Sequence, residues 1–307
     1  MMRNPVYNRE MKVSSRSIRL PIILVLFNGI LSLVTLMNMY SSVAQVESAT
    51  SIQYTSFMEM YGFVTTIEFI LLMFIMPAMT ASSISGERER QTLDLMLTTQ
   101  MTAAQVVLGK LMSALSTLLL LIVSSFPAVT MVFVYGGITW TDAVSLLICY
   151  ITAAFFAGSL GICFSAMLRR STISTVATYG VLAAVVAGTY FINKFFLTMS
   201  SMNINNSVAA YGIGENALKA TSGGVFYLLL LNPAATFFVI ISGQTGGSSP
   251  VSRLSEYFGM SETGFVMDHW VVIGIAIQLL LSCLMIFIAI RCVEPVKHRR
   301  VHKRNIN

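Results

Sequence analysis

Two sets of ionisable residues in this sequence have types and positions that could carry chemistry. One is the stretch GERERQTLDLMLTTQ, residues 86–100, which is the densest cluster of charge in the interior of the chain. The other is Glu68, which stands alone inside a long apolar run. Two carboxylates such as Glu68 and Glu87 could act as general acid and base if they met, whereas a mixed cluster of charges could fix the register of a protein contact.

Other catalytic or ligand-binding patterns are absent from the sequence. The three histidines have no acidic or cysteine neighbours at metal-ligand spacing, and there is neither His-Glu-x-x-His nor Gly-x-Ser-x-Gly. Gly109-Lys110 is not a phosphate-binding loop, because that motif needs glycine at position 104 and Ser or Thr at position 111. We therefore predict no catalytic residue, metal, cofactor or nucleotide site in this chain, and expect Lys110 to extend toward lipid head groups.

The composition excludes a water-soluble globule. Of 307 residues, 55% are hydrophobic and only 10% are charged, with a mean hydropathy of +0.76, whereas soluble domains carry about 25% charged residues. We therefore expect an all-α polytopic membrane protein. The net charge of +6 does not indicate a nucleic-acid partner, because the basic residues gather beside the apolar runs.

Runs of about 20 apolar residues can cross the hydrocarbon core of a bilayer. The sequence holds seven of them, at 20–40, 60–82, 106–135, 143–168, 173–196, 225–242 and 270–289. Sixteen of the nineteen Lys and Arg residues lie at the N-terminus, after the second run, after the fourth run or in the tail. The positive-inside rule makes these segments cytoplasmic, so both termini are predicted to be cytoplasmic and the number of spans to be even.

The run 225–242 is the one that we expect not to cross the membrane. It is short, has Asn232-Pro233 at its middle and is flanked by long polar loops, which is typical of a re-entrant segment buried against protein. The prediction is a six-span domain over 19–292 in the cell membrane. An amphipathic entry helix over 1–18 precedes it, an outer re-entrant region covers 198–267, and a basic cytoplasmic tail covers 293–307.

Residues 86–100 follow the second span on its cytoplasmic side. As one helix they present an apolar face made of Leu93, Leu97, Met101 and Ala104. A capping box of Thr102 and Gln105 then begins the third span. Two interpretations of this amphipathic helix remain open: it lies on the membrane surface with its leucines among lipid head groups, or it docks into a soluble partner.

The longer segment GERERQTLDLMLTTQMTAAQVVLGKL resembles the signature segment of the ABC-2 type transporter permeases. The matching positions are Glu87-Arg88-Glu89, Thr92-Leu93-Asp94, Met96-Leu97, Thr99-Gln100 and Gly109-Lys110. The N-terminal sequence NPVYNREMKVSSRS is similar to the amphipathic entry helix of the same family. Two positions differ: Gln91 stands where the family usually has glycine, and Gln100 where it often has proline.

This resemblance implies the membrane subunit of an ATP-binding cassette exporter. Such a subunit pairs with a second permease subunit, identical or homologous, and with separate ATPase subunits that bind ATP and Mg²⁺. Residues 86–100 would be the coupling helix that sits in a groove of the ATPase. The coupling residues implied are Glu87, Arg88, Glu89, Arg90, Thr92, Leu93, Asp94 and Leu97. The substrate stays open among drugs, lipids and peptides.

Glu68 lies about 12 Å along a helix from Met60, close to the middle of the second span, where an ionised carboxylate needs a partner. The candidate partners are Thr65, Asn28 and Gln278. We assign Glu68, Asn28 and Gln278 to the translocation path or to a dimer interface, with the alternative that Glu68 only holds helices together. An intramembrane enzyme and an ion-coupled secondary transporter are the other functions that Glu68 leaves open.

Small residues recur along the fourth and fifth runs. They are Ala154, Ala157, Gly158, Gly161 and Ser165 on the fourth, and Gly180, Ala184 and Gly188 on the fifth. Such stripes let helix backbones approach closely. They predict either packing within one subunit or a seam between two subunits.

Overall fold

The computed structural model describes residues 5–48, 54–93, 101–136, 139–211, 219–246, 250–260 and 264–294. These residues form helices and their connections, with no strand among them. The longer elements are α1 (Pro5–Arg16), α2 (Arg19–Ser48), α3 (Tyr54–Thr80), α6 (Ala103–Gly136), α7 (Trp140–Met167), α8 (Ser171–Ala183), α9 (Thr189–Tyr211), α10 (Pro233–Gly246) and α13 (Trp270–Val293). The shorter ones are α4 (Ser85–Glu89), the π-helical turn η1 (Ala184–Gly188), the 3₁₀ helix η3 (Gly223–Leu231), α11 (Ser252–Tyr257) and α12 (Phe265–Asp268).

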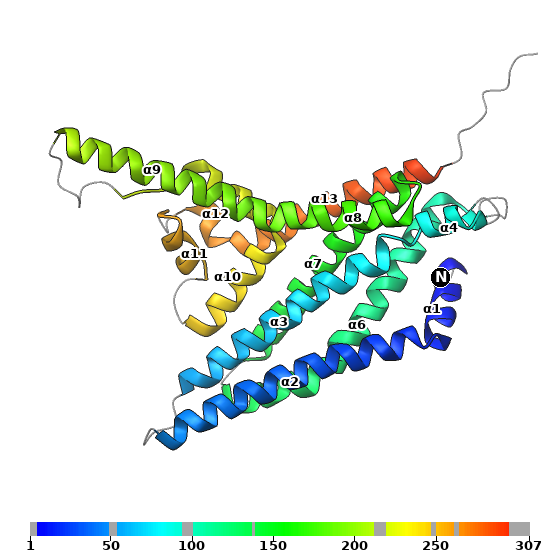
Figure 1. The fold of residues 1–307 in the computed structure, drawn as a ribbon, viewed down its shortest axis with the longest axis horizontal. Coiled ribbons are helices and arrows are strands. Elements are labelled where there is room, and N and C mark those ends of the chain that lie inside the picture. The colour runs from blue at the N-terminus through cyan, green and yellow to red at the C-terminus, as the bar shows by residue number, and fades with distance from the viewer. Residues whose placement is uncertain are drawn as a thin grey trace, which may run out of the picture.

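Six helical runs of the described chain are long and apolar enough to cross a membrane. They are Arg19–Ser41, Met60–Glu89, Ala103–Pro127, Trp140–Met167, Ser171–Ser207 and Trp270–Val293. Each overlaps one of the six predicted spans, so the predicted all-α polytopic fold is confirmed. The second run continues through α4, and α4 lies at the same end of the molecule as α1 and the C-terminal end of α13 (Figure 1).

The remaining apolar run is broken at its middle. There η3 and α10 meet at a bend of 96°, the geometry of a broken span or a re-entrant loop. Asn232 makes the bend: its buried side-chain amide donates hydrogen bonds to the carbonyl of Val186 (3.0 Å) and the hydroxyl of Thr189 (2.8 Å). Pro233 follows and begins α10, where proline needs no amide partner. The run therefore does not cross as one straight helix.

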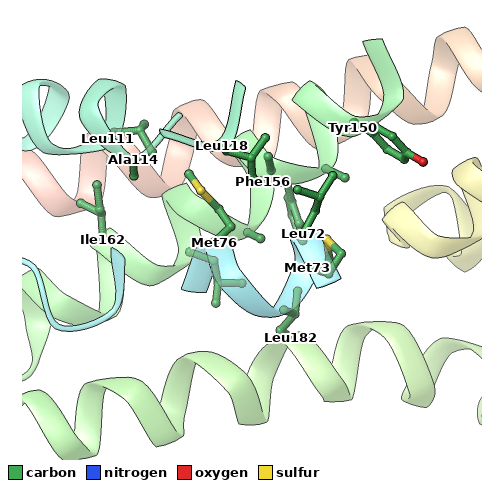
Figure 2. Close-up of a cluster of buried hydrophobic side chains, with 14 of the residues drawn as sticks. Leu72, Met73, Met76, Leu111, Ala114, Leu118, Tyr150, Phe156, Ile162 and Leu182 are labelled. Atoms are coloured by element: carbon green, nitrogen blue, oxygen red, sulfur yellow. The ribbon is translucent and has the colours of Figure 1, made fainter. Parts of the chain in front are cut away.

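Helix α7 is the centre of the bundle. Inside the described chain, 78% of its span window is buried, against 11% for the run formed by α8, η1 and α9. Figure 2 shows the resulting core, in which Met76 of α3 and Phe156 of α7 lie among apolar side chains from α6 and α8. Helix α7 contacts α3, α6, α8, α10 and α13. A shift of α7 would therefore displace most of the spans.

The small residues of α7 are used for packing within this chain. A Cβ atom at Gly161 would overlap the Thr80 side chain of α3, and one at Gly158 would overlap Met76. In contrast, a Cβ at Gly180 or Gly188 would meet no described atom within 4 Å. The predicted close approach of backbones therefore occurs between α7 and α3, whereas the stripe on α8 and η1 faces away from the described chain.

Candidate functional site

The charged stretch after α3 is held against the end of α7. We call residues 85–93 the α4 segment. The hydroxyl oxygen of Ser165 in α7 accepts hydrogen bonds from the backbone amides of Ile84 and Ser85, both at 2.9 Å. The guanidinium of Arg88 donates to the carbonyl oxygen of Ala166 at 3.0 Å, a group near the helix C-terminus that a cation stabilises. Arg88 therefore joins the α4 segment to the last turn of α7.

Glu89 joins the same segment to α8. Its carboxylate accepts hydrogen bonds from the backbone amide of Ser171 at 2.9 Å and from the Ser171 hydroxyl at 2.8 Å. Ser171 is the first residue of α8, where unsatisfied amide groups and the helix dipole both favour a negative charge. Glu89 thus acts as a cap supplied by another helix.

Glu87 joins the segment to α6 and, through α6, to α1. Lys110 of α6 places its Nζ atom 2.9 Å from a carboxylate oxygen of Glu87 and 3.3 Å from one of Glu10 in α1. The Lys110 side chain is only 6% exposed. The expectation that Lys110 extends toward lipid head groups is therefore wrong, because two carboxylates hold its ammonium group inside the protein.

The outer part of the α4 segment turns away from these contacts. Arg90, Gln91 and Thr92 are exposed, whereas Leu93 is buried. The helix ends at Glu89, and Gln91 adopts a positive φ of 57°. The prediction of one continuous helix over 86–100 is therefore wrong at this point.

Two further predictions concern the end of this region. The predicted coupling residues Asp94 and Leu97 lie outside the described residues. At the predicted capping box, Thr102 and Gln105 exchange backbone-to-side-chain hydrogen bonds of 3.0 and 3.2 Å. The predicted start of the third span is thereby confirmed.

Glu68 is only 1% exposed, and hydroxyl groups from two other spans surround it. Ser125 of α6 donates to one carboxylate oxygen at 2.5 Å, and Tyr150 of α7 donates to the other at 3.2 Å. The Tyr150 hydroxyl also lies 3.0 Å from the carbonyl oxygen of Thr65. Of the three partners predicted for Glu68, Thr65 is thus nearby, but through its backbone.

The other two predicted partners of Glu68 are wrong. Asn28 donates to the Ser124 hydroxyl at 2.9 Å and to its own helix. Gln278 donates to the Thr236 hydroxyl at 2.9 Å, in α10. A sequence pattern could not distinguish Ser124 from Ser125, because the rotation of α6 decides which of the two faces α3.

A family model described as ABC-2 family transporter protein matches residues 5–291. The chain belongs to the ABC-2 transporter family. It is accordingly the membrane subunit of an ABC transporter, a family that works with ABC ATPase subunits. The search of curated proteins found no match.

Gln91 has an unfavourable backbone conformation in this ABC-2 permease. Gln91 is the only non-glycine residue with a positive φ in the described part of the chain, and it stands where the resemblance places a glycine. For a residue with a Cβ this conformation costs about 1–2 kcal/mol, a cost that glycine does not have. The helix therefore breaks after α4 even though this position has glutamine and not glycine.

Proposed function

We propose that this ABC-2 permease is the transmembrane subunit of an exporter and that a separate ATPase docks on its α4 segment. The observation that carries this proposal is that some charged residues of the segment contact other helices, whereas others are exposed. Glu87, Arg88 and Glu89 hold α6, α7 and α8 respectively. Arg90 and Gln91 form the exposed turn that follows, and Thr92 is exposed directly after it. A partner that binds the turn could therefore move α6, α7 and α8 together.

The proposed topology has α1, the α4 segment and the C-terminus in the cytoplasm of the cell. Support comes from the basic residues, which gather in these segments, and from the position of α1, α4 and the end of α13 at one end of the molecule (Figure 1). The ion pair from Lys110 to Glu10 would then tie α1 to the docking element. In the proposed complex ATP and Mg²⁺ bind to the ATPase, and a second permease subunit, identical or homologous, completes the membrane part.

An intramembrane enzyme using Glu68 and Glu87 is less well supported. Both carboxylates belong to the helical run Met60–Glu89 and are nineteen positions apart, about 28 Å along a helix. Paired catalytic carboxylates lie within about 10 Å of each other. Each carboxylate also has separate partners. The two groups therefore cannot act on one bond.

Charge reversal at the exposed turn tests the docking proposal. We expect Arg90→Glu to reduce co-purification of the ATPase at least tenfold, because reversing a charge at a contact costs several kcal/mol and 1.4 kcal/mol is a factor of ten. Arg90 is preferable to Glu87 for this test, because reversal at Glu87 would also break the ion pair with Lys110.

The matched control is Arg253→Glu, an exposed position in α11 at the far end of the molecule from α4 (Figure 1). This variant should retain the ATPase at the level of the unchanged chain. Both variants are compared at equal amounts in the membrane fraction. Full retention of the ATPase by Arg90→Glu would exclude docking at this turn.

A further inference from the structure

Glu68 is the floor of a cavity between α6 and α7. The cavity has a volume of about 250 Å³, and apart from Glu68 and Ser125 its lining is apolar and aromatic. Val123, Phe126 and Trp140 are 71%, 51% and 77% exposed, so they form an exposed apolar lip of the cavity.

The carboxyl group at the floor of this cavity has no ion-pair partner among the described residues. None of the ion pairs formed by the described residues includes Glu68, and its hydrogen-bond donors are the neutral hydroxyls of Ser125 and Tyr150. A carboxylate near the middle of a span is stabilised in its ionised form by a cation. The floor of the cavity therefore holds a carboxyl group that a bound cation would stabilise in its ionised form.

The two hydroxyl groups have alternative acceptors. The Ser125 hydroxyl lies 2.8 Å from the carbonyl oxygen of Ile122, and the Tyr150 hydroxyl lies 3.0 Å from that of Thr65. Each hydroxyl carries one hydrogen and can turn it from the carboxylate to the carbonyl. A ligand can therefore take over the carboxylate oxygens without leaving a buried hydroxyl hydrogen unpaired.

We propose that this cavity binds a lipophilic organic cation, with its ammonium group at Glu68 and its apolar part between α6 and α7. Three observations agree with this class of ligand: the carboxyl group at the floor, which forms no ion pair with the described residues, the apolar walls, and the aromatic rings of Phe126, Trp140 and Tyr150, whose faces attract cations. The exposed apolar lip lets such a cation enter the cavity. The inference rests on the cavity alone and needs no ATPase.

Binding of benzyltrimethylammonium to the purified chain tests the site. We use nanodiscs of phosphatidylglycerol, a lipid without an ammonium group, and equilibrium dialysis with the radiolabelled cation. Glu68→Gln should weaken binding at least tenfold, since the amide keeps a hydrogen-bond acceptor but loses the charge. The control Glu256→Gln changes an exposed carboxylate in α11 and should leave binding unchanged.

The uncharged isostere neopentylbenzene distinguishes a cation site from an apolar cavity. It should not displace the radiolabelled cation from the unchanged chain. Displacement by the isostere, or equal affinity of Glu68→Gln and the unchanged chain, would overturn the inference. Repeating the measurement in phosphatidylethanolamine identifies the source of the ammonium group: weaker Glu68-dependent binding supports a lipid head group as the occupant, and equal binding supports a free cation.

Discussion

Gly161→Val is expected to lower the free energy of unfolding by about 3 kcal/mol, the upper part of the range for overpacking a core. A Cβ atom at position 161 would overlap the side chain of Thr80 and lie 3.2 Å from the backbone nitrogen of Ala81. Thr80 cannot easily move, because it is buried and its hydroxyl donates to the carbonyl of Met76 at 2.9 Å. The extra atoms of valine must therefore push α3 away from α7.

Unfolding by sodium dodecyl sulfate in mixed micelles measures this effect. Gly180→Ala is the matched control, because a Cβ there meets no described atom within 4 Å. In a helix interior, alanine should raise stability by about 0.5–1 kcal/mol. Equal stability of Gly161→Val and the unchanged chain would mean that α3 and α7 do not approach each other at this glycine.

Lys110→Met is expected to destabilise the chain by about 3 kcal/mol, as expected when one partner of a buried ion pair is removed. The substitution keeps an unbranched side chain of similar length but leaves the carboxylates of Glu10 and Glu87 without their cation. The second carboxylate oxygen of Glu87 is buried and has no hydrogen-bond partner among the described residues. The loss of Lys110 therefore leaves a largely unsolvated negative charge.

A double-mutant cycle separates this charge effect from lost packing. Adding Glu87→Gln to Lys110→Met should recover part of the lost stability, because glutamine removes the unpaired negative charge at position 87. Arg291→Met is the exposed control: its ion pair with Glu294 has side chains 66% and 51% exposed, and such pairs contribute about 0–1 kcal/mol. If Lys110→Met were as mild as Arg291→Met, the link between α1 and the α4 segment would not be an ion pair that stabilises the fold.

The spans could be predicted because a membrane-crossing helix depends only on the residues of its own segment. About 20 consecutive apolar residues cross a bilayer whatever their neighbours are, and the broken run around Asn232-Pro233 also follows from local chemistry. The capping box at Thr102 is local in the same way. These elements therefore agree between sequence and structure.

The partners of the charged residues could not be predicted, because they depend on how whole helices rotate. Glu68 meets Ser125 and Tyr150 only because α6 and α7 turn those residues toward α3. The sequence predicts Lys110 at the lipid surface, but the approach of α1 and the α4 segment encloses it. The break at Gln91 could not be predicted for a different reason: glutamine does not indicate a left-handed backbone, whereas glycine at this position would indicate one.

The central claim is that an ATPase binds the exposed turn of the α4 segment from the cytoplasm. Its most direct test replaces Arg90 with the photoreactive residue p-benzoylphenylalanine and illuminates intact cells that express the ATPase. The account predicts a covalent adduct between this chain and the ATPase from position 90 and none from position 253 in α11. An adduct from position 253 but not from position 90 would contradict it.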